Sequence, residues 1–113
     1  MNREPDDWGR DPQVQRMRLV FAALEESQAG LLKGLGLAWG DPRLAPARSE
    51  ARACFARAWP RALGRGLARE PGEAAQLYLC CLARGLSRQG VNPPPELLPK
   101  DGVWFALAAG VLS

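Results

Sequence analysis

The sequence contains no histidine, no isoleucine and no threonine among its 113 residues. Without an imidazole, no Ser-His or Cys-His nucleophile pair can form, and no histidine can bind a metal or shuttle protons near neutral pH. The chain also lacks a glycine-rich phosphate loop between a strand and a helix, and it lacks the spacing of metal ligands. We therefore expect a protein that is not an enzyme, with no catalytic residue, no cofactor and no metal site.

Cysteine is scarce and offers little chemistry. The three thiols belong to Cys54, Cys80 and Cys81, which form no CxxC motif. On a helix, Cys80 and Cys81 would point about 100° apart, so they cannot easily bind one ion or each other. We therefore expect three buried, inert cysteines. An odd number of thiols is typical of a protein in a reducing compartment.

Long hydrophobic runs are also missing. The most apolar stretch, residues 103–112, is far shorter than the roughly 20 apolar residues that a membrane span needs. The first eleven residues, MNREPDDWGRD, are polar and lack the apolar run of a signal peptide. Together with the odd number of thiols, these absences predict a cytoplasmic protein without a membrane span.

The scarcity of β-branched residues determines the expected fold class. Five valines are the only such residues, whereas alanine and leucine are abundant. Strands favour β-branched and aromatic side chains, and helices favour alanine and leucine. We predict an all-α fold, a compact bundle in a single helical domain of residues 1–113, with residues 1–10 as a flexible N-terminal segment. Four main helices with Gly/Pro-rich connections are expected at about 12–33, 45–66, 71–89 and 102–112.

Prolines, glycines and aspartates set the expected helix ends. Asp11 can cap the first helix, and Pro12 suits its first position, where a missing N–H costs nothing. Gly90 closes the third helix, and Asp101 can cap the last. Pro60 predicts either a kink in the second helix or the start of a new one, because it removes an amide and clashes with the preceding turn.

Apolar residues three and four apart follow one face of the first predicted helix, with Gln28 as the only polar interruption. The row contains Val14, Met17, Phe21, Leu24, Leu31 and Leu35. It can pack within the bundle, or its first four members can form the seam of a homodimer in which Gln28 sets the register. In the third predicted helix, apolar residues cover more than half of the circumference, which predicts a central helix with neighbours on two sides.

Arginine is concentrated in residues 43–69, which hold seven arginines and one glutamate. Five of them follow the second predicted helix and are the candidate contacts to a partner or to phosphate: Arg48, Arg52, Arg57, Arg61 and Arg65. Three interpretations stay open for this arginine-rich helix. The face is only solvated, it binds an acidic protein partner, or it follows the phosphates of a nucleic acid.

Tryptophan is frequent for a chain of this length, with four residues. Trp59 and Trp104 lie in apolar helical rows and are expected in the core. Trp8 and Trp39 lie beside glycine and charged residues, and they are candidate interface anchors or else hydrophobic lids. We expect the last helix to close the core through Trp104, Leu107, Ala108 and Val111.

These patterns favour a small non-enzymatic helical protein that acts through protein–protein contacts, as an accessory, adaptor or assembly subunit of a larger complex. Its partner would be another protein with an acidic or mixed surface. The alternative is a nucleic-acid-associated small subunit that uses the arginine-rich helix face on phosphates. A third possibility is a bundle that encloses an apolar ligand among its leucine and aromatic side chains.

Overall fold

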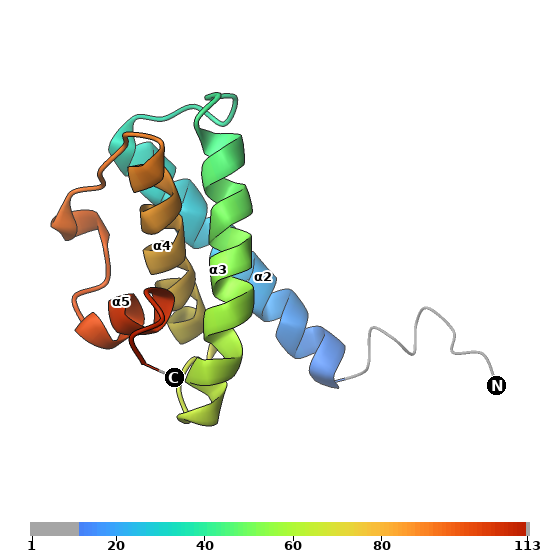
Figure 1. Ribbon diagram of the computed structural model, residues 1–113. Coiled ribbons are helices and arrows are strands. Elements are labelled where there is room, and N and C mark those ends of the chain that lie inside the picture. Colours follow the sequence, from blue (N-terminus) through green and yellow to red (C-terminus); the bar gives the residue numbers. More distant parts are fainter. Residues whose placement is uncertain (1–11, 113) are drawn as a thin grey trace.

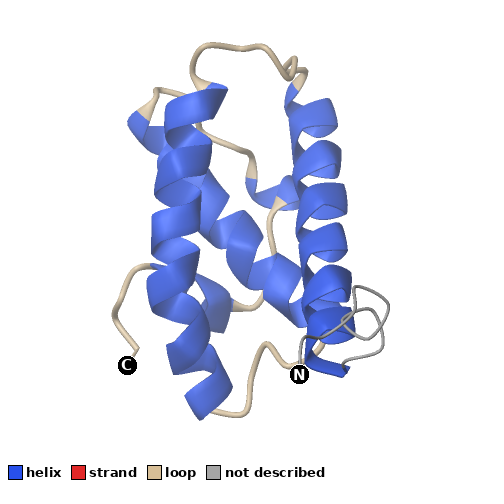
Figure 2. Ribbon diagram, turned by 90° about the vertical axis from the view of Figure 1, so that its right-hand side faces the viewer, coloured by secondary structure: helices blue, strands red, loops and turns tan. Residues whose placement is uncertain are grey.

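The computed structural model describes residues 12–112, which form four α-helices and one short 3₁₀ helix. These are α2 (Pro12–Leu35), α3 (Leu44–Gly64), α4 (Pro71–Arg88), η1 (Pro95–Leu97) and α5 (Gly102–Ala108). No strand occurs within the described residues (Figure 2). The predicted all-α bundle of four main helices is therefore confirmed. The predictions for residues 1–10, for Trp8 and for the Asp11 cap lie outside the described residues.

The centre of the bundle is α4, which packs against α2, α3 and α5, whereas α2 and α3 scarcely contact each other. In Figure 1, α3 and α4 lie side by side and α2 crosses behind them. Side chains of α4 are buried over much of its circumference, as the breadth of its apolar surface predicts. They include Ala74, Leu77, Tyr78, Cys81, Leu82 and Leu86. The prediction of a central helix with neighbours on two sides is confirmed.

A glycine in the left-handed region follows each of the four α-helices, and two of them illustrate how the ends are closed. Gly36 has φ 69° directly after α2, and the Leu37 amide then donates to the Leu32 carbonyl at 2.9 Å. Gly90 has φ 82° after α4 and permits the same closing bond, from the Val91 amide to the Leu86 carbonyl at 2.9 Å. Each bond satisfies a carbonyl that the helix end would otherwise leave without a partner.

The second predicted helix is one helix, α3, and no second helix begins at Pro60. Pro60 has no N–H to donate to the Ala56 carbonyl, so this helical hydrogen bond is missing. Both residues are exposed. Because water reaches this side of the helix, the interruption does not leave a buried acceptor unsatisfied. The helix therefore tolerates a proline that would break it on its buried side.

The last helix, α5, is shorter than the expected span. The Asp101 side chain caps its start by accepting from the Val103 amide at 3.0 Å. Trp104, Leu107 and Ala108 are buried as predicted. The prediction that Val111 closes the core is wrong, because the chain turns at Gly110 (φ 77°) and leaves Val111 76% exposed.

The apolar row of α2 is only partly buried. Leu24 and Leu31 pack in the core, but Phe21 is 54% exposed, while Val20 and Leu32, which lie outside the row, are almost fully buried. The row therefore identifies the buried side of the helix only approximately. The physical reason is that α4 is the only α-helix on which α2 packs extensively, and the flank that carries Phe21 faces α3 without touching it closely.

Candidate functional site

The gap between α2 and α3 forms a groove of about 450 Å³, to which α4 contributes Tyr78. Its walls carry both apolar and basic side chains: Phe21 and Leu24 from α2, and Arg48, Arg52, Phe55 and Trp59 from α3. We name it the α2–α3 groove. It exists because both helices pack on α4 but diverge from each other, so that large side chains line a concave surface and do not fill it.

Three aromatic rings are fixed at the base of the groove. The rings of Phe55 and Trp59 are stacked, with their centroids 5.2 Å apart and their planes at 24°. The Tyr78 ring meets the Phe55 ring edge-on, with a distance of 5.9 Å between centroids. The Trp59 Nε1–H donates to the Ala68 carbonyl at 3.3 Å, which fixes the orientation of the indole. The apolar base is therefore preformed, and no partner is needed to assemble it.

A buried hydrogen bond joins the two sides of the base. The Tyr78 hydroxyl donates to the Gln28 Oε1 at 2.8 Å, and Gln28 is only 3% exposed. Burial raises the pKa of Tyr78 above its ordinary value, against the opposing effect of the positive charges of Arg48 and Arg52. The phenol therefore stays neutral and remains a donor at neutral pH. Gln28, the polar interruption of the α2 row, finds its partner on α4 and not on a second chain.

The groove continues at both ends into further hollows. One end lies between Trp39 and Arg48, and the other lies beside Trp59 and Leu63. From Arg48 to Leu63 the wall spans sixteen residues of α3, or about 22 Å at the rise of an α-helix. Phe21, Trp39 and Leu63 are the large apolar side chains exposed along this length, at 54%, 58% and 37%. An elongated apolar surface is thus open to solvent.

The two rims of the groove carry opposite charge. Arg48 and Arg52 line the α3 rim, and Glu25 lines the α2 rim. The Arg48 guanidinium carbon lies 5.8 Å from the Trp39 ring centroid, so the exposed indole rests beside a cation. The Arg48 Nε is buried and has no hydrogen-bond partner among the described residues. A buried donor without a partner favours an incoming acceptor.

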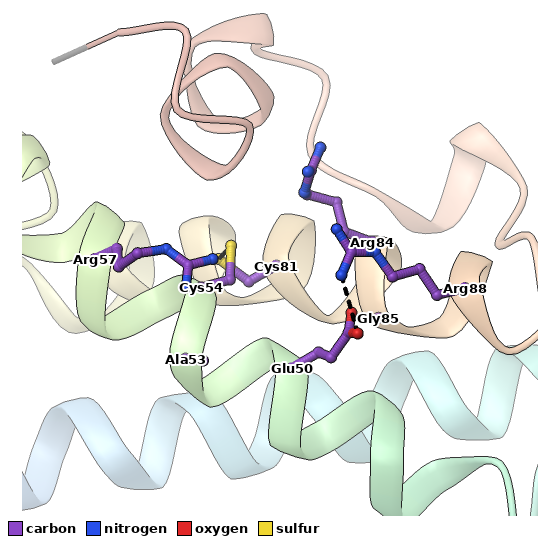
Figure 3. Close-up of a pocket in the computed structure, with 8 residues that line it drawn as sticks. All are labelled: Glu50, Ala53, Cys54, Arg57, Cys81, Arg84, Gly85 and Arg88. Carbon is purple, nitrogen blue, oxygen red and sulfur yellow. Dashed lines mark hydrogen bonds and ion pairs between the residues drawn. The ribbon is translucent and has the colours of Figure 1, made fainter.

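The structure does not bring the five predicted arginines together. Arg48 and Arg52 line the α2–α3 groove, whereas Arg57 lies on the other side of α3, in a pocket shared with α4 (Figure 3). Arg61 reaches toward Gly110 beyond α5, and Arg65 follows the end of α3. The arginines therefore belong to two surfaces of the molecule and form no single continuous face.

Sequence reasoning missed a pair of cysteines between α3 and α4. The Sγ atoms of Cys54 and Cys81 are 2.8 Å apart, and the Cys54 thiol also lies 3.3 Å from the Ala108 carbonyl oxygen of α5. All three cysteines are buried, as predicted. Nothing in the sequence pairs Cys54 with Cys81, because their meeting depends on the register between two helices and not on local spacing.

The environment of the pair separates the three thiols chemically. The hydrogen bond between the two thiols lowers the pKa of Cys54 to about 7, helped by Arg84, Arg57 and Arg88 and opposed by burial. The same hydrogen bond raises the pKa of Cys81, and burial adds to that rise. Burial raises the pKa of Cys80 to about 12. Of the three, only Cys54 has an appreciable thiolate population near neutral pH.

Comparison with known proteins supplies no identity for this chain. It matches no protein family model, no curated protein and no solved structure. Within residues 12–112, no cluster of three or more possible ligands could hold a metal ion, and no helix is long and apolar enough to cross a membrane. The functional conclusions therefore rest on the α2–α3 groove and on the cysteine pair.

Proposed function

We propose that the protein is a non-enzymatic binding protein, an accessory, adaptor or assembly subunit, that receives an amphipathic helix of a partner protein in the α2–α3 groove. The observation that carries this proposal is the preformed aromatic base of the groove, open to solvent and bordered by a basic rim. Exposed apolar surface of this extent is typical of sites that bind other macromolecules.

The shape of the groove favours a helix over a small ligand. Its wall runs along α3 for about 22 Å, which corresponds to about 15 residues of a bound helix. A helix would insert side chains at i, i+3, i+4 and i+7 between Phe21 and Trp59, in the manner of helix-in-groove recognition. Trp39 and Leu63, at the two ends, offer apolar contacts that a compact ligand at the centre would not reach.

The charges specify the chemistry of that helix. Arg48 and Arg52 are one helical turn apart, so two carboxylates spaced by four residues on the partner can pair with them. Glu25 on the opposite rim disfavours acidic residues on the other flank. The partner helix is therefore apolar on one face, acidic along the flank that meets α3, and neutral or basic on the other flank.

The alternatives predict other behaviour of the same surface. A nucleic-acid partner would use Arg57 and Arg61 together with Arg48 and Arg52, but these pairs lie on different sides of α3, so we favour the protein partner. A homodimer through the α2 row would bury the exposed Phe21 in a second copy. A cytoplasmic location belongs to this proposal and rests on the odd number of cysteines.

The test uses a fluorescently labelled, designed helical peptide of about 16 residues, with leucines at i, i+3, i+4 and i+7 and two glutamates four apart on one flank. Anisotropy is measured against the full chain, with a peptide carrying lysines in place of the glutamates as the matched probe. We expect the acidic peptide to bind at least about tenfold more tightly than the lysine peptide.

Two variants locate the binding surface, and a third is the control. Phe21→Ser and Arg52→Glu should each weaken binding of the acidic peptide by about tenfold or more, because both side chains line the groove. Arg57→Glu changes the same charge on the same helix outside the groove and should leave binding unchanged. All three residues are exposed, so circular dichroism should show unchanged folding.

Other outcomes would replace the proposal. Equal loss of binding in Arg52→Glu and Arg57→Glu, together with tight binding of a generic DNA duplex that weakens steeply with salt, would establish the nucleic-acid alternative. A wild-type chain that is dimeric in light scattering, and that Phe21→Ser converts to a monomer, would show that a second copy covers the groove.

A further inference from the structure

The closest approach between α3 and α4 brings two sulfur atoms within reach of a covalent bond. A Cβ at Gly85 of α4 would collide with the backbone carbonyl of Ala47 in α3, so the two backbones are nearly in contact. At this seam the Cys54 and Cys81 Sγ atoms are 2.8 Å apart. A disulfide needs a separation of about 2.05 Å, so the sulfurs must move by less than about 1 Å to be joined.

A small pocket of about 120 Å³ connects this pair with solvent. Figure 3 shows Cys54 and Cys81 at one end of the pocket, with Arg57, Arg84 and Arg88 around it. Cys54 is 6% exposed and Cys81 is fully buried. A cavity needs only about 10–15 Å³ to hold a water molecule, so the pocket admits a solute as small as hydrogen peroxide.

The charged groups around the pocket are predominantly positive. Helix α3 contributes Glu50 and Arg57, and α4 contributes Arg84 and Arg88. Glu50 accepts from the Arg88 Nη1 at 3.0 Å, so the only carboxylate that lines the pocket is paired. From α5, the Ala108 carbonyl oxygen faces the sulfur of Cys54. The hydrogen bond with Cys81 and the positive charges of Arg84, Arg57 and Arg88 lower the pKa of Cys54, whereas burial opposes them.

We propose that Cys54 and Cys81 form a hydroperoxide-reactive dithiol site, which is oxidised to a disulfide that joins α3 to α4. The inference is independent of the α2–α3 groove. It rests on the short distance between the sulfurs, on the pocket that opens to them and on the arginines that surround it.

The reaction takes place in two steps. The Cys54 thiolate attacks one oxygen of the hydroperoxide, the O–O bond breaks, and the leaving oxygen takes up a proton to become an alcohol, or water when the oxidant is hydrogen peroxide. Cys54 is then a sulfenic acid. The Cys81 sulfur attacks the Cys54 sulfur, the S–O bond breaks, and the hydroxide leaves as water with the proton that Cys81 gives up. In total, the two thiols lose two electrons as the disulfide forms, and one hydroperoxide gains them.

Cys80 provides an internal control for this reaction. It is fully buried, it does not line the pocket, and its thiol is protonated at neutral pH because burial raises its pKa to about 12. As the neighbour of Cys81 on α4, it has nearly the same sequence context. The site therefore requires Cys54 and Cys81 and does not require Cys80.

The decisive experiment uses the Cys80→Ala variant of the full chain, in which Cys54 and Cys81 are the only thiols. The reduced, folded protein is treated with hydrogen peroxide, free thiols are blocked with N-ethylmaleimide, and intact mass is measured. We expect a monomer that has lost about 2 Da and takes up no maleimide. Trypsin should then yield a linked pair of peptides, Ala53–Arg57 and Glu70–Arg84.

Variants that lack one cysteine, and the pH dependence of the oxidation rate, give the second readout. In Cys81→Ser the reaction should stop at the sulfenic acid of Cys54, which dimedone traps, and in Cys54→Ser the peroxide should be consumed at least about tenfold more slowly. The rate in Cys80→Ala should rise with a midpoint near pH 7, because the pKa of Cys54 is about 7.

Two results would overturn the inference. One is a folded Cys80→Ala chain that keeps both thiols under peroxide while the same chain, unfolded in urea, is oxidised. The other is a wild-type chain whose linkage joins Cys80 to Cys81 or joins two molecules, since either shows that the sulfurs of Cys54 and Cys81 do not react with each other.

Discussion

The two sides of α3 meet their neighbours in opposite ways. Toward α4, the helix presents small residues such as Ala47, Ala51 and Cys54, and Gly85 of α4 lets the backbones come nearly into contact. Toward α2, the same helix presents Arg48, Arg52 and large aromatic rings, and the helices stay apart around a groove of about 450 Å³.

This difference shows how side-chain size divides one helix between two roles. Interaxial distance follows the size of the residues at the contact, so small residues produce a tight seam and large ones a concave surface. The tight seam fixes atoms within bonding range, as with the Cys54 and Cys81 sulfurs. The open groove leaves apolar area exposed for a partner. Each of the following predictions perturbs one side and leaves the other as its reference.

Closing the seam with a covalent bond should have the largest effect. A Cys54–Cys81 disulfide closes a loop between residues 27 positions apart, which in the chain-entropy model stabilises the folded state by about 3–4 kcal/mol. Urea unfolding of oxidised and reduced Cys80→Ala measures this difference. A stability gain below about 1 kcal/mol would mean that the bond strains the seam.

Filling the close contact in the seam should come next. Gly85→Ala introduces a methyl group against the Ala47 backbone, which cannot move aside as a flexible side chain can, and we expect a loss of about 2–3 kcal/mol of folding free energy. Gly30→Ala is the matched control, since it lies within α2 with open space around it. It should stabilise the protein by about 0.5–1 kcal/mol. Similar effects of the two substitutions in chemical denaturation would contradict the close approach.

Substitutions at two neighbouring residues of α2 should distinguish a core position from a position in the groove wall. Val20→Ala removes methyl groups from a fully buried position and should reduce the unfolding free energy by about 2 kcal/mol. Phe21→Ala acts on a side chain that is 54% exposed, and it should change the unfolding free energy by no more than about 0.5 kcal/mol. Thermal unfolding of both variants checks the pair, and a larger loss for Phe21→Ala would show that something already covers the groove.

An effect smaller than that of Val20→Ala is expected at the base of the groove. Tyr78→Phe removes the donor to Gln28 and should reduce stability by about 1 kcal/mol at neutral pH. Because burial raises the pKa of Tyr78, its contribution is complete below the unfolded value of about 10 and is lost as pH rises through the higher folded value. The free energy of unfolding, measured between pH 8 and pH 11, should therefore fall more steeply with pH for wild type than for Tyr78→Phe. Parallel curves would contradict the buried hydrogen bond.

The sequence predicts the helices well, because their ends and apolar breadth are local properties. Gly36 and Gly90 close helices through their own φ angles, and Asp101 caps one through its own carboxylate. Spacing also places Leu24 and Leu31 in the core. These features depend on residues within one or two turns of each other, which a sequence displays directly.

The candidate sites could not be predicted in the same way, because they depend on how helices meet. The arginine repeat is one example. Arg48 and Arg57 are nine residues apart, about 900° around the helix, so they point to opposite sides, and only the packing shows that one side holds a groove and the other a thiol pocket. The contact between Cys54 and Cys81 likewise requires the register of α3 on α4, which local spacing does not contain.

The brevity of α5 has a consequence for access to the sulfur atoms. A helix of seven residues is not stable alone in water, so α5 stays folded only while Trp104 and Leu107 remain docked on α3 and α4. We expect it to be the first helix to detach in a local opening event, because it is the shortest of the four α-helices. Since the Ala108 carbonyl rests against Cys54, each such event uncovers that thiol. If the proposed reaction takes place, we expect bulky reagents to reach the thiol only in such events, whereas a solute as small as hydrogen peroxide fits the pocket.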